Sequence, residues 1–201
     1  MQLHSLNLAV EGNLDEAVLR RILREMATGR VPAPCYGHHG KDYLRKLVFR
    51  LNPRELTTPW IIMVDLDCDL CPPDLIEGWT DPRRNPQILI RVAVREVESW
   101  LLAHRDGIAG YLGVEKRRIP LDPDSVEKPK ELLIDLAKRS KRKAIREDLV
   151  PAPRSTSKIG KGYNSALRGF VERTWDISKA RQRSQSLDAA IRAISQLVQG
   201  S

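Results

Sequence analysis

Short apolar runs and helical patterns alternate along the first half of the chain. The apolar runs predict four strands, at residues 3–10, 29–37, 60–64 and 87–94. Between them, apolar positions recur at helical spacing over residues 15–26 and 43–51. The segment at 29–37 contains two prolines, so we expect it to be at best an edge strand. Strands that alternate with helices predict an α/β fold with a mostly parallel sheet flanked by helices.

The second half of the chain has helical patterns in place of strands. Residues 97–112, VESWLLAHRDGIAGYL, predict one helix, and the basic stretch at residues 127–148 predicts another, amphipathic helix. The stretch that follows is rich in Pro, Gly and Ser and predicts a loop. We therefore expect an α/β core at residues 1–105 and a basic helical extension at residues 106–201, packed on or beside the core.

Composition limits the class of protein. Of the 201 residues, 41% are hydrophobic, which is enough for a buried core. The chain contains no run of about 18 apolar residues that would predict a membrane-spanning helix. Its first residues, MQLHSLNLAV, lack the pattern of a signal peptide. Three cysteines do not make a disulfide framework, so we expect a cytoplasmic protein with no membrane partner.

The net charge of +8 lies in the second half of the chain. Residues 1–100 hold 13 Lys/Arg and 14 Asp/Glu, whereas residues 101–201 hold 21 and 12. Within residues 138–183 there are 14 basic and 4 acidic residues. This distribution suits a polyanion, although a solvated helical face is the other interpretation. Trp175 lies among these basic residues, where it could fill a core or stack on a base.

Acidic residues follow three of the predicted strands. They are Glu11 and Asp15 after the first, Asp65 and Asp67 after WIIMV, and Glu96 and Glu98 after QILIRVAV. Ligands of open α/β sheets bind beyond the carboxyl ends of the strands, and strand residues two apart point to one face, so Asp65 and Asp67 are expected to converge. A hard divalent cation relieves the repulsion among clustered carboxylates. The pattern therefore predicts one or two Mg²⁺ or Mn²⁺ ions.

Each acidic position also has a simpler interpretation. Asp15 and Asp69 suit helix caps or the surface, and Glu96 and Glu98 suit the first turn of a helix. The run IIMVD resembles a Walker B strand, but the chain has no GxxxxGK[ST], so no nucleotide site is expected. DLDCD nearly matches the D-x-D-x-[T/V] of haloacid-dehalogenase phosphatases, which normally lies on the first strand. Here a complete strand and helix precede it.

Zinc is not expected from the spacing of cysteine and histidine. Cys68 and Cys71 form a single C-x-x-C without a second pair. Cys35, His38 and His39 lie upstream of it at no standard spacing.

Two motifs resemble those of Toprim domains, especially the Toprim domains of OLD (overcoming lysogenization defect) nucleases. VEGNLDEAVL, residues 10–19, resembles the E-G-x-x-D-x-x-x-L opening, and VDLDCD, residues 64–69, resembles the Toprim D-x-D. In that fold the glutamate follows strand one and the D-x-D follows the third strand, which is the order here. VREVESWLLA, KPKELL, GKGY and RTWDISKARQRSQSLDAAI resemble a family of small bacterial proteins of unknown function with a Toprim-like core.

The resemblance implies a Toprim-like metal-dependent nuclease. It implies metal binding by Glu11, Asp15, Asp65 and Asp67, with Glu96 or Glu98 as a further ligand. It also implies a lysine that stabilises charge at the phosphate, Lys158 or Lys161. The expected catalytic residues are Glu11, Asp65, Asp67, Glu98 and Lys161. The residues expected to bind nucleic acid, DNA more than RNA, are Lys138, Arg139, Lys141, Arg142, Lys143, Lys158, Lys161 and Arg168.

The resemblance also implies a partner. OLD nucleases carry a fused ATPase that this chain lacks, so a separately encoded ATPase and a role in phage defence or nucleic-acid processing are expected. A homo-oligomer stays open. The alternatives are a non-catalytic nucleic-acid-binding or regulatory subunit of an ATPase complex and, more distantly, a haloacid-dehalogenase-like phosphatase.

Overall fold

The computed structural model describes residues 5–26, 34–80 and 85–199. The chain forms two compact units, the first made of Met1–Val94 with Asp188–Ser201 and the second of Arg95–Leu187. The predicted division lay after residue 105, whereas the helix at Glu98–Ala103 already lies in the second unit. The parts of the predicted strands at 3–4 and 29–33 lie outside the described residues.

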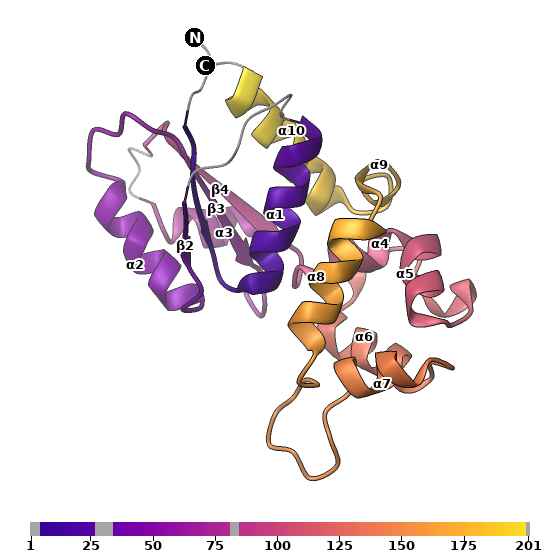
Figure 1. Cartoon of the computed structure of the whole chain (residues 1–201). Coiled ribbons are helices and arrows are strands. Elements are labelled where there is room, and N and C mark those ends of the chain that lie inside the picture. The colour runs from indigo at the N-terminus through magenta and orange to yellow at the C-terminus, as the bar shows by residue number, and fades with distance from the viewer. Residues whose placement is uncertain (1–4, 27–33, 81–84, 200–201) are drawn as a thin grey trace. The chain divides into compact units, whose positions relative to one another are not determined.

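The first unit contains a four-stranded parallel sheet (Figure 1). Its strands are β1 Asn7–Val10, β2 Cys35–Gly37, β3 Trp60–Asp65 and β4 Ile88–Ala93, in the order β2-β1-β3-β4. Leu8 of β1 is aligned with Cys35 on one side and Ile61 on the other. The α/β class and the parallel sheet are therefore confirmed, and β2 is an edge strand, as the prolines that precede it in the sequence indicated.

Helices cover both faces of this sheet (Figure 1). Helix α1, Asn13–Met26, packs on β1 and β3, whereas α2, Lys41–Leu51, and α3, Pro72–Glu77, lie on the other face. Every residue of β3 is buried, which is why WIIMV is a continuous apolar run without alternation. This burial holds the carboxyl end of β3 at a fixed place.

The second unit is helical. Its elements are α4 Glu98–Ala103, α5 Arg105–Leu112, the 3₁₀ turns η1 Lys116–Arg118 and η2 Pro123–Ser125, α6 Pro129–Lys138, α7 Lys143–Leu149, α8 Tyr163–Arg173 and α9 Ile177–Ala180. The last helix, α10 Gln185–Gln199, begins in this unit and continues in the first. None of the helices in the described ranges has the length and apolar character that crossing a membrane requires.

Two predicted helices are each divided in the structure. The helix expected at 97–112 is interrupted at His104, whose Nδ1 accepts a hydrogen bond from the backbone nitrogen of Asp176 at 3.0 Å. The helix expected at 127–148 ends at Lys138 and restarts at Lys143. Ser140 lies in this gap, and its Oγ accepts from the backbone nitrogen of Arg142. Such side-chain to backbone bonds compete with helix continuation.

Trp175 belongs to the core of the second unit. It is 1% exposed, and its Nε1 donates to the carbonyl oxygen of Trp100 at 3.1 Å. The suggestion that Trp175 stacks on a base is therefore wrong, because no face of its ring is open to a ligand.

Candidate functional site

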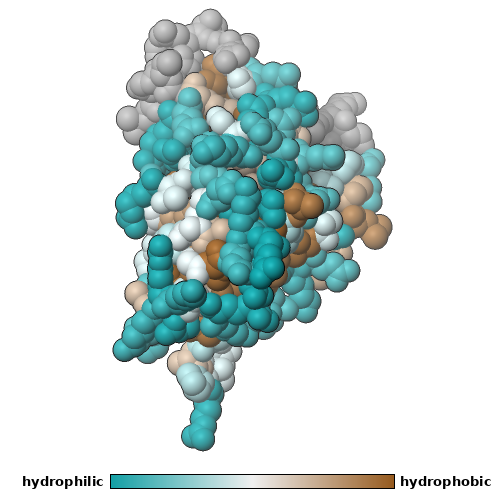
Figure 2. Space-filling model, turned by 90° about the vertical axis from the view of Figure 1, so that its right-hand side faces the viewer, coloured by the Kyte–Doolittle hydropathy of each residue, from teal (hydrophilic) through white to brown (hydrophobic). Residues whose placement is uncertain are grey.

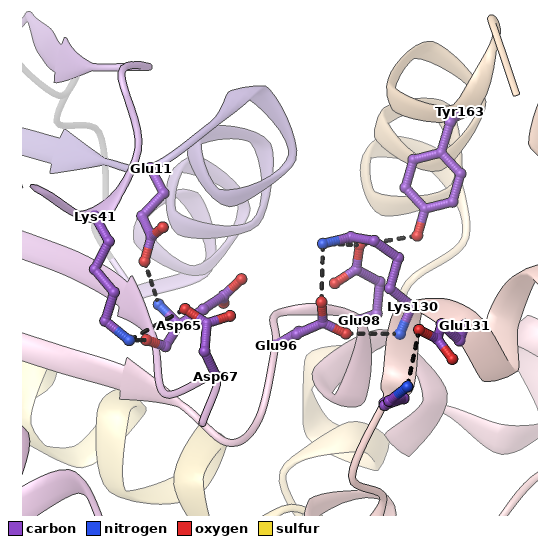
Figure 3. Close-up of polar contacts among 10 residues, drawn as sticks. Glu11, Lys41, Asp65, Asp67, Glu96, Glu98, Lys130, Glu131 and Tyr163 are labelled. Atoms are coloured by element: carbon purple, nitrogen blue, oxygen red, sulfur yellow. Dashed lines mark hydrogen bonds and ion pairs between the residues drawn. The ribbon is translucent and has the colours of Figure 1, made fainter. Parts of the chain in front are cut away.

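Glu11 and Asp65 meet where β1 and β3 end (Figure 3). Glu11 follows β1 directly and Asp65 is the last residue of β3, and the two strands are parallel neighbours. The backbone nitrogen of Asp65 donates to Oε1 of Glu11 at 2.8 Å. Parallel pairing thus brings two carboxylates that are far apart in sequence to one edge of the sheet, as the acidic pattern predicted.

Asp15 lies on the same unit, in the first turn of α1. Its side chain is buried, as is that of Asp65, with 6% and 8% exposed. A Cβ added at Gly12 would lie 3.3 Å from Oδ2 of Asp15, so the glycine lets this carboxylate approach the turn after β1. The expectation that Asp15 could be a surface residue is therefore wrong. Buried carboxylates are costly without compensation, and a divalent cation would provide it.

Asp67 lies in a turn and not on a strand, contrary to the prediction from the sequence. Strand β3 ends at Asp65, and Asp67 lies in the following turn with φ 53°, a left-handed backbone conformation. The argument that the two aspartates share a face because they are two residues apart on one strand is therefore wrong. The Asp67 side chain is 46% exposed, in contrast to that of Asp65.

Lys41, which was not among the predicted site residues, holds this turn. Its Nζ donates to the carbonyl oxygen of Asp65 at 2.8 Å and to Oδ2 of Asp67 at 3.1 Å (Figure 3). It also donates to the carbonyl oxygen of Leu66 at 3.0 Å. Oδ2 of Asp69 lies 2.7 Å away. Burial lowers the pKa of Lys41, but the hydrogen bonds to Asp69 and Asp67 outweigh burial, so this pKa is raised above its ordinary value. The ammonium group is therefore charged at neutral pH.

A sequence signal for Lys41 does exist. It is the first residue of α2, where the helix dipole disfavours a cation. Lys130, in the first turn of α6, is a second example. A lysine at such a position is electrostatically disfavoured unless other groups stabilise it, and both of these lysines have an acidic partner outside their own helix.

Glu96 and Glu98 lie in the second unit and bind Lys130 (Figure 3). Both the backbone nitrogen and Nζ of Lys130 donate to Glu96, at 2.9 and 3.0 Å. Glu98 is 1% exposed and accepts from the hydroxyl of Tyr163 at 2.8 Å, with Nζ of Lys130 at 3.7 Å. Burial raises the pKa of Glu98; Lys130 opposes this rise and Glu96 adds to it. Among the residues described, Oε2 of Glu98 has no hydrogen-bond partner. The role of either glutamate as a metal ligand stays a prediction.

All eight residues expected to bind nucleic acid are exposed. Several make local contacts: Lys138 with Asp135, Lys143 with Glu147 and Arg168 with Glu172. On the face in Figure 2, hydrophilic side chains cover most of the surface. Binding of nucleic acid by these residues stays a prediction.

Two of these lysines share a cavity in the second unit. Lys138 and Lys161 line a space of about 510 Å³ together with Arg146 and the apolar residues 150–153. Lys158 and Lys161 belong to the loop that extends from α7 to α8 (Figure 1).

The donor set of the first unit fits a hard cation. Glu11, Asp15, Asp65 and Asp67 offer carboxylate oxygens only, the ligands that Mg²⁺ and Mn²⁺ prefer. No three of their ligand atoms lie within 4.8 Å of one another; in the described ranges, Glu16, Cys35 and His38 have one oxygen, one sulfur and one nitrogen that do. Mg²⁺ keeps several waters and is commonly bound through one or two carboxylates, so a closed cage is not required.

Comparisons with known proteins give two similar structures. The first is the C-terminal region of the Burkholderia pseudomallei OLD protein, 15% identical, covering 92% of this chain and 98% of that chain with a TM-score of 0.45. The second is the C-terminal region of the Xanthomonas campestris pv. campestris OLD protein, 16% identical, covering 83% and 95% with a TM-score of 0.35. No family model and no curated protein matches the chain. The candidate site rests on the contacts above.

Proposed function

We propose that the carboxylates at the ends of β1 and β3 bind Mg²⁺ or Mn²⁺ and that the protein is a metal-dependent nuclease. The observation that supports this most is the contact between Glu11 and Asp65, because it places two carboxylates at the strand-end edge where α/β sheets bind ligands. Asp67 and the buried Asp15 add oxygen donors on the same unit.

The residues of the first unit have distinct roles in this proposal. Glu11, Asp65 and Asp67 hold the ion, and Lys41 fixes the turn that carries Asp67. The ion, when bound, supplies an activated water and stabilises charge on the phosphate. Glu98 and Lys161 stay proposed catalytic residues of the second unit, on the resemblance to OLD nucleases.

We propose DNA as the substrate, held by the basic residues of the second half. Phosphate contacts dominate affinity for nucleic acid and weaken with salt. Binding should therefore decrease as salt is raised, and Lys161→Ala or Arg139→Ala should reduce it on every DNA sequence alike.

The test is cleavage of plasmid, single-stranded DNA and RNA with Mn²⁺, Mg²⁺ or EDTA. Wild-type protein is compared with Glu11→Ala and Asp67→Ala, and with Glu55→Ala as a control because Glu55 is an exposed acid of the same unit. Metal-dependent cleavage that both site variants lose and the control keeps supports the proposal. Cleavage that persists in Glu11→Ala and Asp67→Ala contradicts it.

A second candidate is a non-catalytic nucleic-acid-binding or regulatory subunit. The ion pairs of Lys41 with Asp67 and Asp69 favour it, because a side-chain ammonium already neutralises part of the site. Binding of DNA without cleavage, together with no calorimetric signal for Mn²⁺, would select this function. Hydrolysis of small phosphate esters that polynucleotides do not inhibit would instead select the more distant phosphatase.

We also propose a separately encoded ATPase partner and a role in phage defence, on the resemblance alone. The partner should co-purify with a tagged form of the protein from its own cells, and its ATP hydrolysis should change when the protein is added. Recovery of the protein without any ATPase would contradict this proposal.

A further inference from the structure

Three different metal-binding side chains meet beside β2. Glu16 lies in the first turn of α1, Cys35 begins β2 and His38 follows it. One ligand atom from each lies within 4.8 Å of the other two, and Nε2 of His38 is 3.1 Å from Oε2 of Glu16. All three belong to the first unit, and none of them is used by the proposed nuclease site.

The backbone is arranged so that His38 turns back towards the helix. Gly37 has φ 109°, and a Cβ there would lie 2.1 Å from the carbonyl oxygen of Val10, so the position requires glycine. His38 follows with φ 64°, a left-handed conformation that costs a non-glycine residue roughly 1–2 kcal/mol. Its backbone nitrogen still donates to Val10, which continues the pairing of β2 with β1.

The donors suit a borderline-soft ion. A thiolate sulfur, an imidazole nitrogen and a carboxylate oxygen are the ligands of Zn²⁺, and three protein ligands with one open position are common for zinc. The thiolate and the carboxylate together balance a divalent charge. Arg20 binds Oε1 of Glu16 at 2.6 Å, which leaves Oε2 directed to His38. The side chain of His38 is 32% exposed, so the open position can be reached by water.

We propose that Glu16, Cys35 and His38 bind a Zn²⁺-like transition-metal ion whose fourth position is taken by water. This proposal goes beyond the nuclease site, which has oxygen donors only. On binding, the Cys35 thiol loses its proton to solvent and His38 coordinates through Nε2 in place of its contact with Glu16.

Metal binding would change the protonation of Cys35. Burial, and then the charge of Glu16, raise the pKa of the thiol to about 12, so the free site holds a neutral thiol. A coordinated metal favours the thiolate and reverses this preference. Metal binding at the site should therefore release a proton, and affinity should increase with pH.

The expectation of no zinc rested on spacing along the chain. Zinc motifs are recognised by short intervals between Cys and His along the chain, and Cys35, His38, Cys68 and Cys71 do not match such a motif. Intervals of this kind do not reveal a ligand that comes from a distant helix or strand. Glu16 is such a ligand, 19 residues before Cys35, and the folding of α1 along β1 brings the two together.

Cobalt provides the test, because Co²⁺ replaces Zn²⁺ and a thiolate ligand gives a charge-transfer absorption band in the near ultraviolet. The full-length protein is titrated with Co²⁺ and then with Zn²⁺. We expect the band in wild-type protein and in the Cys68→Ser control, its absence in Cys35→Ser, and affinity reduced by more than about tenfold in His38→Gln and Glu16→Gln. Zn²⁺ should displace Co²⁺ and remove the band.

No band in wild-type protein, or a band that persists in Cys35→Ser, would overturn the proposal. Thermal unfolding without metal checks that each variant is folded, and Glu16→Gln keeps the test valid if Cys35→Ser does not fold. The two metal sites can be tested independently of each other. Asp65→Asn and Asp67→Asn should leave the cobalt band unchanged, and His38→Gln should leave Mn²⁺-dependent cleavage unchanged.

Discussion

The carboxylate of Glu11 accepts a hydrogen bond from the backbone nitrogen of Asp65, 54 residues further along the chain. This bond joins the ends of two neighbouring parallel strands just where the ladder of β1 and β3 stops. Glu11 therefore has two roles. The structural role requires only an oxygen that accepts a hydrogen bond, whereas the proposed metal-binding role requires the negative charge of the carboxylate. Substitution can separate the two.

Glu11→Gln should keep the fold and lose the metal. The glutamine carbonyl can still accept from Asp65, so unfolding free energy should stay close to that of the wild type, whereas calorimetric affinity for Mn²⁺ should fall. Glu11→Ala should lose both, with stability lower by about 1–2 kcal/mol because the Asp65 nitrogen loses its acceptor. Equal metal affinity in Glu11→Gln and the wild type would show that Glu11 is structural alone.

Lys41→Met should destabilise the first unit by about 1–3 kcal/mol in EDTA, because the carbonyl oxygens of Asp65 and Leu66 lose a charged donor. The folded pKa of Lys41 lies above its ordinary 10.5, so this stabilisation is present below pH 10.5 and is lost as pH rises past the folded pKa. Urea unfolding of both proteins measures it. Lys46→Met, an exposed lysine of the same helix, is the control and should change little.

Glu98→Gln should stabilise the protein at neutral pH. Burial raises the folded pKa of Glu98 above its ordinary 4.5, so its favourable contribution is complete below pH 4.5 and is lost as pH rises through the folded pKa. Glutamine keeps an acceptor for Tyr163 and does not ionise. The stability difference between variant and wild type should therefore grow from pH 4.5 to neutral pH. A constant difference across this range would mean that Glu98 is charged in the folded protein.

His104 should make the protein sensitive to mild acid. Burial lowers its pKa, and Nδ1 must stay unprotonated to accept from Asp176. A lowered folded pKa gives stability that is present above pH 6.5 and is lost as pH falls below it. In His104→Asn, Oδ1 can take the place of Nδ1, so thermal unfolding should become less dependent on pH below 6.5. If thermal unfolding of His104→Asn depends on pH as in the wild type, the sensitivity to acid comes from another titratable group.

Gly107 lies directly against the ring of His104. A Cβ added there would lie 2.2 Å from Cε1 of the imidazole, so Gly107→Ala must displace His104. We expect a loss of about 1–3 kcal/mol of stability from overpacking. Gly110→Ala is the matched control, because a Cβ there meets nothing within 4 Å, and it should be neutral or stabilising in the same helix.

Long patterns in the sequence predicted the fold well. WIIMV is apolar without interruption because β3 is buried on both faces, and an apolar run of this kind can be recognised from the sequence alone. The breaks at His104 and Ser140 were missed because each depends on a hydrogen bond that the pattern of apolar positions does not contain. Ser140 bonds two residues ahead, whereas His104 bonds to Asp176, far along the chain.

The candidate site was only partly predictable, for a similar reason. Glu11 and Asp65 follow strands, so the rule for strand ends was sufficient to place them together. The partners Lys41 and Tyr163 act through contacts across 24 and 65 residues, which the spacing of apolar positions does not reveal, although Tyr163 belongs to the GKGY motif. The position of Lys41 in the first turn of a helix was the one local sign that it has an acidic partner.

Asp65 and Asp67 are held by different parts of the structure. Asp65 is the final rung of a buried ladder, so its displacement would break pairing with β4, whereas Asp67 lies on an exposed turn outside any strand. If both carboxylates bind the proposed ion, the sheet fixes one of them, whereas the position of the Asp67 carboxylate depends on the turn that Lys41 holds. Loss of the Lys41 contacts would then displace one ligand of the proposed site and leave the other in place.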